Sequence, residues 1–335
     1  MWSSIRALLS LAWQEHFKRA TVTLFILCFF CGHVVPTGVL LVLLVTPLAP
    51  IVVIYFSWIL VFDWKSPSMS WLWPVSVRRS NYLRNARFFH FFRDFFPVKL
   101  VKTAELDPSR NYVFAYHPHG VFAVGVFANF ATEATGFSAT FPGITVWPMT
   151  VPIVFSAPVL REWLMLLGAR SVTTSGCRGI LASGPGNAVA IVPGGTREIL
   201  EARPKESKLA IRKRKGFIRI ALETGSPVVP VYGFGENDLF DQPKSKYILS
   251  FQRYCTERFG LSLPFFQGNE LARMLPHRRP VTTVVGEPMV VPQVEKPTAE
   301  IVDHWHAMYL EKLSNLFDMH KEKYGYEPEK KLEFI

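Results

Sequence analysis

The chain has 335 residues, of which 49% are apolar, and a formal net charge of +11. This length suits one large domain or two modest ones, and the positive mean hydropathy favours association with a membrane. The charge predicts anionic partners, but no zinc-finger, basic-zipper or RNA-binding aromatic signature accompanies it, so nucleic acid is not expected.

Cysteine usage indicates a reducing environment. The four cysteines, at positions 28, 31, 177 and 255, form neither a disulfide framework nor a paired CxxC metal pattern. Cys28 and Cys31 lie in an apolar run, where thiols usually act as small packing residues. We therefore expect a cytosol-facing protein without a metal.

An uncharged N-terminal stretch runs from Thr21 to Phe62, without Lys, Arg, Asp or Glu. Because a hydrocarbon core of ~30 Å takes about 20 helical residues, this stretch is long enough for two membrane spans or one bent hairpin. Pro36 and Gly38 mark the expected bend, and Pro47 and Pro50 are expected to kink the second arm. The alternative is a buried helix pair in a soluble protein.

Basic residues flank this stretch on both sides. They are Arg6, Lys18 and Arg19 before it, and Lys65, Arg78, Arg79, Arg84 and Arg87 after it. The positive-inside tendency then places both ends in the cytosol. We expect a cytosolic segment over residues 1–20 and a membrane hairpin over 21–62.

The segment Phe88 to Leu100 reads FFHFFRDFFPVKL. Phenylalanines interrupted by charges suit a segment that lies in the membrane interface, and a packed core helix is the equally weighted alternative. We assign residues 63–101 to an interfacial segment and 102–335 to a cytosol-facing globular domain.

Strand-like and helix-like patterns alternate through the globular domain. Strands are predicted at 112–115, 188–192, 228–232 and 281–285, and helices at 158–168, 216–223 and 298–324. Such alternation predicts an α/β fold around a mixed, mostly parallel sheet. Histidines 304, 306 and 320 of the last helix are expected to face solvent.

Residues Tyr116 to Gly120 read YHPHG, directly after a predicted strand. Histidine exchanges a proton near neutral pH, so a rigid turn that presents His117 and His119 indicates general-base chemistry. The alternatives are a metal-ligand pair and two ordinary loop histidines. The surrounding motifs have to distinguish these readings.

Four blocks in order resemble those of the glycerolipid acyltransferase superfamily: YHPHG at 116–120, LGARSV at 167–172, VPGGTREIL at 192–200 and SPVVPVYGFG at 226–235. The closer resemblance is to the family of diacylglycerol acyltransferase 2 and the monoacylglycerol acyltransferases. It rests on HPHG, NFATEATGFS at 129–138, RKGFIRIALETGSPVVPVYGFGEND at 214–238 and FDMHKEKYG at 317–325, and it covers nearly the whole chain.

The resemblance implies a glycerolipid-acyltransferase-like domain that transfers a fatty acyl group from acyl-CoA to a mono- or diacylglycerol hydroxyl. Acyl-CoA is then a co-substrate and no cofactor is expected. The family implies that the protein resides in the endoplasmic reticulum membrane and on its lipid droplets. A homo-oligomer is compatible with this expectation. Alternatives are a wax synthase, which acylates a long-chain alcohol, and a non-catalytic membrane-hairpin protein that binds acyl-CoA or coats droplets.

The resemblance makes His117 the counterpart of the catalytic histidine in the superfamily motif H-x4-D, with His119 as the other candidate. The aspartate position of that motif is Phe122 here, so a simple His-Asp pair is not expected. Glu133 or Glu198 can supply the carboxylate that orients the imidazole ring. A buried structural hydrogen bond is the alternative for each glutamate.

Two further segments are candidates for substrate contact. The first is the segment 192–198, in which glycines allow close approach to a substrate or supply amide donors to an oxyanion. The residues of this segment and of the histidine turn that we assign to substrate binding are Pro118, Gly120, Pro193, Gly194, Gly195, Thr196 and Arg197. Lipid phosphate acyltransferases carry glutamate at the position of Gly194, so the glycine suits a neutral acceptor.

The second segment holds eight basic residues between 203 and 219. It is either a solvated or membrane-facing surface, or the binding site for the CoA phosphates. The residues assigned to substrate binding here are Arg212, Arg214, Lys215, Gly216, Phe217 and Arg219.

Overall fold

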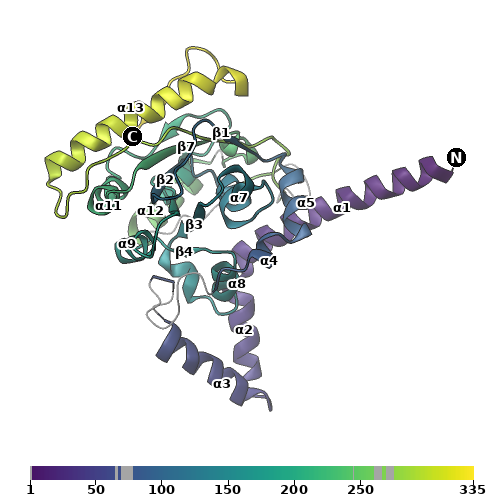
Figure 1. The fold of residues 1–335 in the computed structure, drawn as a ribbon. Coiled ribbons are helices and arrows are strands. Elements are labelled where there is room, and N and C mark those ends of the chain that lie inside the picture. Colours follow the sequence, from purple (N-terminus) through teal and green to yellow (C-terminus); the bar gives the residue numbers. More distant parts are fainter. Residues whose placement is uncertain (1, 65–66, 69–77, 244, 260–265, 269–274) are drawn as a thin grey trace.

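The computed structural model describes residues 2–64, 67–68, 78–243, 245–259, 266–268 and 275–335 (Figure 1). Lys65, one of the predicted flanking charges, lies outside the described residues. The helices are α1 Trp2–Cys31, α2 Val34–Leu43, α3 Ala49–Trp58, η1 Ile59–Asp63, α4 Asn81–Arg84, α5 Arg87–Phe95, α6 Val124–Val126, η3 Phe127–Ala131, α7 Phe137–Thr140, η4 Pro152–Ser156, α8 Leu160–Leu166, α9 Thr174–Leu181, α10 Thr196–Glu201, α11 Gly216–Thr224, η5 Glu236–Leu239, α12 Lys246–Phe259, α13 Ala299–His320 and η6 Glu322–Tyr324. The strands are β1 Lys99–Lys102, β2 Tyr112–His117, β3 Thr145–Thr150, β4 Arg170–Ser171, β5 Asn187–Ile191, β6 Lys208–Leu209, β7 Val228–Phe234, β8 Thr282–Val285 and β9 Glu333–Phe334.

Within the described ranges, seven strands form one sheet in the order β1-β8-β7-β2-β5-β3-β4. All neighbours are parallel except β7 and β8, so the predicted mixed, mostly parallel sheet is confirmed. Strand β2 lies at its centre, where Phe114 pairs with Ala190 of β5 and Val229 of β7. Because β2, β3, β5 and β7 run the same way, their carboxyl ends meet at one edge.

Helices cover both faces of the sheet. Successive side chains of a strand point to opposite faces, and in β2 Val113 and Ala115 face one cluster while Phe114 and Tyr116 face another. The first cluster takes its helical side chains from α9, α11 and α13, and the second from α6, η3 and α7 (Figure 1). The central strand is therefore buried on both sides, which explains its continuous apolar sequence.

The predicted elements of the globular domain are present with shifted ends. Helix α11 ends at the left-handed Gly225, with φ +63°, as the sequence predicts. His117 differs, because it is the last residue of β2 and not part of the turn. His306 was expected to face solvent, but only 4% of it is exposed, since that side of α13 packs against Phe217.

The N-terminal helix α1 begins at Trp2, well before the uncharged stretch. It bends into α2 across Gly32 and His33, by 66°, and not at Pro36 or Gly38. No single helix among the residues described is both long and apolar enough to cross a bilayer; Leu9–Cys31 and Val34–Leu43 reach that length and composition only together, across the bend.

Helix α5 holds the phenylalanine-rich segment against α1. Its rings at Phe89, Phe92 and Phe95 are buried, and the Phe92 ring lies 5.0 Å from that of Phe25, centroid to centroid. These three rings therefore lie in the protein interior, as the packed-helix alternative predicts, and they are not available to a membrane interface.

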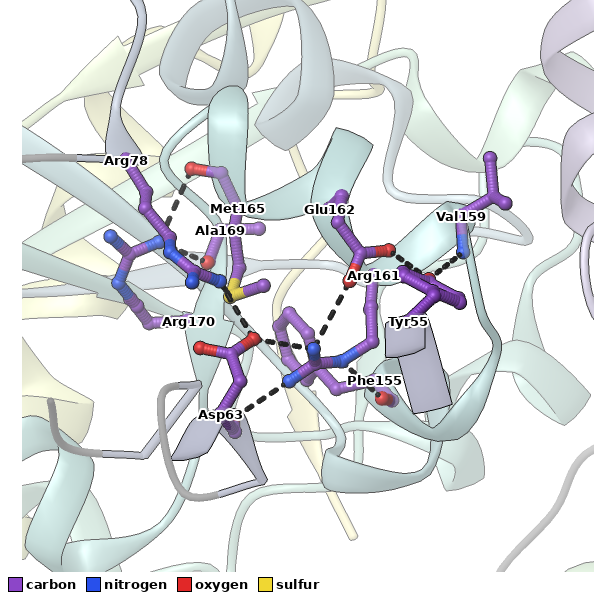
Figure 2. Close-up of polar contacts among 10 residues, drawn as sticks. All are labelled: Tyr55, Asp63, Arg78, Phe155, Val159, Arg161, Glu162, Met165, Ala169 and Arg170. Carbon is purple, nitrogen blue, oxygen red and sulfur yellow. Dashed lines mark hydrogen bonds and ion pairs between the residues drawn. The ribbon is translucent and has the colours of Figure 1, made fainter. Parts of the chain in front are cut away.

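A buried ion pair fastens the second apolar arm to the globular domain (Figure 2). Asp63, which ends η1, accepts hydrogen bonds from Arg161 of α8 at 2.5 Å and from Arg78 at 2.7 Å. Eight residues earlier in this arm, in α3, Tyr55 donates to Glu162 at 2.9 Å. Because Asp63 and Arg161 are each 1% exposed, the pair depends on both partners to offset the loss of hydration.

We predict that Asp63→Ala lowers the free energy of unfolding by about 3 kcal/mol, because it removes the buried carboxylate from the buried Arg161 guanidinium. The carboxylate that remains is that of Glu162, at 3.1 Å and 33% exposed. Thermal or urea unfolding of the full chain in detergent measures the change. Glu105→Ala is the matched control, since its 2.7 Å ion pair with Lys102 is 82% exposed on the glutamate side and should contribute less than about 1 kcal/mol. Equal effects of the two substitutions would contradict the prediction.

Candidate active site

The histidine turn lies at the carboxyl edge of the sheet, where β2 ends. The ring of His117 is fully enclosed, with 0% exposure. Its Nε2 lies 3.1 Å from the hydroxyl oxygen of Tyr309, which also lies 3.3 Å from the carbonyl oxygen of Ala115. Tyr309 is on α13 and is itself fully buried, so His117 is packed into the interior behind the turn.

His119 lies on the other side of the cis peptide between His117 and Pro118, and it is only half-buried. Its Nδ1 is 3.1 Å from the carbonyl oxygen of Gly120. Because a carbonyl oxygen can only accept, Nδ1 carries the proton, and Nε2 is left with a free lone pair. Burial lowers the pKa of His119 below its ordinary value of 6.5, so the ring is neutral at pH 7. These are the properties of a general base.

Glu198, in the first turn of α10, ties the histidine turn to the chain that follows α10. Its Oε2 accepts from the backbone N–H of His119 at 2.8 Å, and its Oε1 accepts from the N–H of Ala210 at 3.0 Å. Oε1 also lies 3.8 Å from Nδ1 of His117, beyond hydrogen-bond range but close enough for electrostatic attraction. The structure thus brings Glu198 together with both histidines.

Gly194 makes room for this carboxylate. A Cβ at position 194 would lie 1.9 Å from Cδ of Glu198, a distance that no side chain tolerates. The next residue, Gly195, has φ +55°, and its N–H donates to the carbonyl oxygen of Val192 at 3.2 Å. The Gly195 amide is therefore engaged within the turn. The two glycines shape the turn that directs Glu198 inward.

Glu236 is a buried carboxylate to which sequence reasoning assigned no role. It accepts from the hydroxyl of Tyr116 at 2.7 Å, from the N–H of Val124 at 2.6 Å and from the N–H of Gly125 at 2.9 Å. A Cβ at Gly120 would lie 2.7 Å from its Cγ. Glu236 therefore fixes the loop after the histidines. The feature of the sequence that could have identified it is its position in FGEND at 234–238, directly after the apolar strand β7.

Glu133, the other predicted partner for a histidine, lies in a different cluster. It accepts from Arg84 at 2.8 Å and from the hydroxyl of Ser138 at 2.9 Å. Within the described part of the chain it has no hydrogen bond or ion pair with His117 or His119. Its carboxylate instead balances the buried charge of Arg84, which is 0% exposed, so the structural alternative holds for Glu133.

Phe122 occupies the position where the superfamily motif has aspartate, and here it belongs to an aromatic cluster. Its ring centroid lies 4.7 Å from that of Phe29 in α1 and 5.3 Å from that of Phe240. Helix α1 thus packs directly on the loop that follows the histidines. The carboxylate that lies near the two histidines is that of Glu198, on another element.

The basic segment divides into engaged and unengaged side chains. Arg212 donates to the carbonyl oxygen of Phe334, Lys215 to Asp303 and Arg219 to the carbonyl oxygen of Pro297. Phe217 is 4% exposed and packs on Tyr309, so it belongs to the core and is not placed to touch a substrate, whereas Gly216 is exposed.

The side chains of Arg197, Lys213 and Arg214 are exposed, and none of them has an ion pair or side-chain hydrogen bond to another described residue. Arg197 directly precedes Glu198 in α10. Of the other residues expected to contact a substrate, Pro193 and Thr196 are half-buried and Pro118 is buried. Across the chain as described, no three histidine, cysteine or acidic side chains are grouped to hold a metal ion.

Comparisons with known proteins show which proteins this chain is similar to. A family model described as diacylglycerol acyltransferase matches residues 41–335. Human acyl-CoA wax alcohol acyltransferase 1 is 43% identical over 300 residues, which cover 88% of this chain and 89% of that protein. Diacylglycerol O-acyltransferase 2 from Xenopus laevis is 40% identical over 352 residues, 99% of this chain and 94% of that protein. The crystal structure of the acyltransferase PlsC from Thermotoga maritima covers 79% of this chain and 90% of that chain, with 16% identity and a TM-score of 0.40, a likeness too distant to inform the site.

The carboxyl of Glu236 predicts a pH-dependent stability. Burial raises its pKa from the ordinary 4.5 to about 7, against three donors that favour the charged form. Because the pKa is higher in the folded than in the unfolded protein, the folded protein holds this proton more tightly. The resulting contribution to the free energy of unfolding is fully present below pH 4.5 and is lost as pH rises through about 7. We expect wild type to lose about 3 kcal/mol of unfolding free energy over that window relative to Glu236→Gln, which cannot ionise.

Urea unfolding of both proteins across this pH range measures the difference. Glu105→Gln is the control, because Glu105 is exposed and should follow wild type at every pH. Parallel curves for wild type and Glu236→Gln would contradict the prediction.

Proposed function

The chain belongs to the diacylglycerol acyltransferase family, and we propose that it transfers a fatty acyl group from acyl-CoA to the hydroxyl of a mono- or diacylglycerol, with His119 as the general base. The observation that carries the assignment is the 3.1 Å contact between Nδ1 of His119 and the carbonyl oxygen of Gly120. It leaves Nε2 as a lone-pair acceptor on a half-buried ring.

The reaction needs one proton to move twice. Nε2 of His119 takes the proton of the acceptor hydroxyl while that oxygen attacks the thioester carbon, and the resulting tetrahedral oxyanion collapses with cleavage of the C–S bond. The electron pair leaves on the CoA sulfur, which then takes the proton back from the imidazolium. Because a thiolate is a good leaving group, direct transfer needs no covalent enzyme intermediate.

The enclosure of His117 supports His119 as the base, although sequence alignment favoured His117. With 0% exposure and Nε2 against Tyr309, the His117 ring has no open nitrogen toward a substrate. Glu198 holds the backbone of His119, and the proximity of its negative charge stabilises the imidazolium formed during the reaction. We therefore assign His117 and Glu198 to positioning the turn.

The exposed cations beside the turn suit the phosphates of CoA. Arg197 precedes Glu198, and Lys213 and Arg214 follow the Ala210 segment that Glu198 binds. Charge-assisted bonds to phosphate are strong, and these three side chains are exposed. Arg212, Lys215 and Arg219 already have protein partners, so they are weaker candidates for this contact.

We also propose that the uncharged arms hold the enzyme in the endoplasmic reticulum membrane, with both termini cytosolic, and allow residence on lipid droplets. Helix α2 has 10 residues, or about 15 Å at 1.5 Å per residue, half of a hydrocarbon core of ~30 Å. Exposed apolar side chains such as Leu41 and Val42, at 57% and 64% exposure, cover its surface. These features support a hairpin that dips into one leaflet, fastened by Asp63.

A wax synthase is the second candidate, since a relative at 43% identity is named for wax alcohol acylation. Acceptor choice depends on the shape of the site around the attacking hydroxyl. The third candidate, a non-catalytic hairpin protein, does not account for a base and carboxylate arranged at the sheet edge.

We predict that His119→Ala lowers kcat/KM for acyl transfer by about 100- to 10,000-fold, the usual contribution of a general base. In wild type, the acid limb of the kcat/KM profile should lie below pH 6.5, because the pKa of His119 is lowered from that value. Acyl transfer from labelled acyl-CoA in purified membranes measures both. His304→Ala, at an exposed histidine of α13, is the control. An active His119→Ala enzyme would overturn the assignment.

The acceptor is tested by competition. Labelled acyl-CoA is offered with monoacylglycerol, diacylglycerol and long-chain alcohol together, and we expect diacylglycerol and triacylglycerol to exceed wax ester. A predominant wax ester would establish the second candidate instead. Absence of every product from wild type, with acyl-CoA still bound, would support the non-catalytic alternative.

A further inference from the structure

Helix α12 buries two uncharged polar residues and exposes three aromatic residues. Gln252 is 0% exposed and Thr256 is 8% exposed. On the opposite side, Tyr247, Phe251 and Tyr254 are 76%, 52% and 58% exposed. Their spacing of four and three residues places the three rings on one helix face. A helix that faced only water would have the reverse pattern.

The charges of α12 favour an anionic surface. Its basic residues Lys246, Arg253 and Arg258 are exposed, and its one acidic residue in the sequence is Glu257. Aromatic rings flanked by lysine and arginine are typical of helices that lie in the membrane interface, where the rings enter the acyl boundary and the cations meet lipid headgroups. A protein partner of neutral or basic surface would not match this combination.

The helix lies at the edge of the sheet that carries the histidine turn. It follows β7, which is parallel to β2, so both strands end at the same edge. Gln242, just before α12, donates to the carbonyl oxygen of Ile199 in α10 at 2.8 Å, next to Glu198. After α12, Phe266 stacks on Phe30 of α1 with ring centroids 5.8 Å apart. The chain on both sides of α12 therefore contacts the elements that surround the histidine turn, α10 before it and α1 after it.

We propose that α12 is an interfacial helix that docks Tyr247, Phe251 and Tyr254 into a lipid surface rich in anionic headgroups, beside the active site. This inference rests on the proposed function, because an acylglycerol acceptor resides in lipid and must reach His119 from it. The arms anchor the chain, whereas α12 brings the carboxyl edge of the sheet against the surface from which the acceptor enters.

The test compares an acceptor in a surface with one in solution. The full chain with Tyr247→Ser, Phe251→Ser and Tyr254→Ser combined is assayed on long-chain diacylglycerol in vesicles of one part phosphatidylserine to three parts phosphatidylcholine, and on a short-chain diacylglycerol dissolved as monomers. We expect kcat/KM to fall about tenfold on the vesicles and to stay at the wild-type value in solution. The control is Met308→Ser with Met319→Ser, which removes exposed apolar side chains from α13.

Unchanged activity on the vesicles, or an equal loss with both acceptors, would overturn the proposal. Photocrosslinking gives an independent measurement. The variant Phe251→p-benzoylphenylalanine, which keeps Tyr247 and Tyr254, is illuminated on the same vesicles. Adducts to phospholipid are expected, and adducts to a second copy of the chain would show that α12 is a protein interface instead. If wild type forms lipid adducts but acylates neither acceptor, the proposed function fails while the docking surface stands.

Discussion

The site depends on one carboxylate placed between two backbone segments. Glu198 accepts from the N–H groups of His119 and Ala210, and it reaches them only because Gly194 has no side chain where the carboxylate lies. Since buried hydrogen bonds to a charged group are strong and directional, this contact sets the position of the turn relative to α10. The general-base geometry of His119 follows from it.

Two other buried carboxylates extend the same principle. Glu236 holds the loop after the histidines through two backbone N–H groups and Tyr116, so the turn is fixed from both ends. Asp63 joins the uncharged arm to α8 through Arg161. Each carboxylate is buried and has several donors, which offset part of its loss of hydration. The sheet edge that carries the histidine turn and the apolar arms are thereby held in one arrangement, as the proposed entry of a lipid acceptor at that edge requires.

Much of the fold was predictable because burial leaves a simple pattern in sequence. Strands β2, β5 and β7 are continuous apolar runs between helices, as expected for the centre of a parallel sheet, and Gly225 ends α11 as a left-handed cap. The bend between α1 and α2 was misplaced to Pro36 and Gly38, because proline is tolerated in the first turn of a helix and does not by itself locate a break. The interior position of the α5 phenylalanines depends on α1, whose packing no local pattern reveals.

The sequence by itself determined the family, the reaction class and the short list of acid and base residues, since these rest on residue types in fixed local order. Only the tertiary structure separated His117 from His119, because residues two apart in one motif point to different environments once β2 is buried and Tyr309 covers one ring. It also distinguished Glu198 from Glu133 and gave Glu236 a role. The effect of a carboxylate on a partner depends on the distance between them, and these distances are set by contacts between segments far apart in the chain.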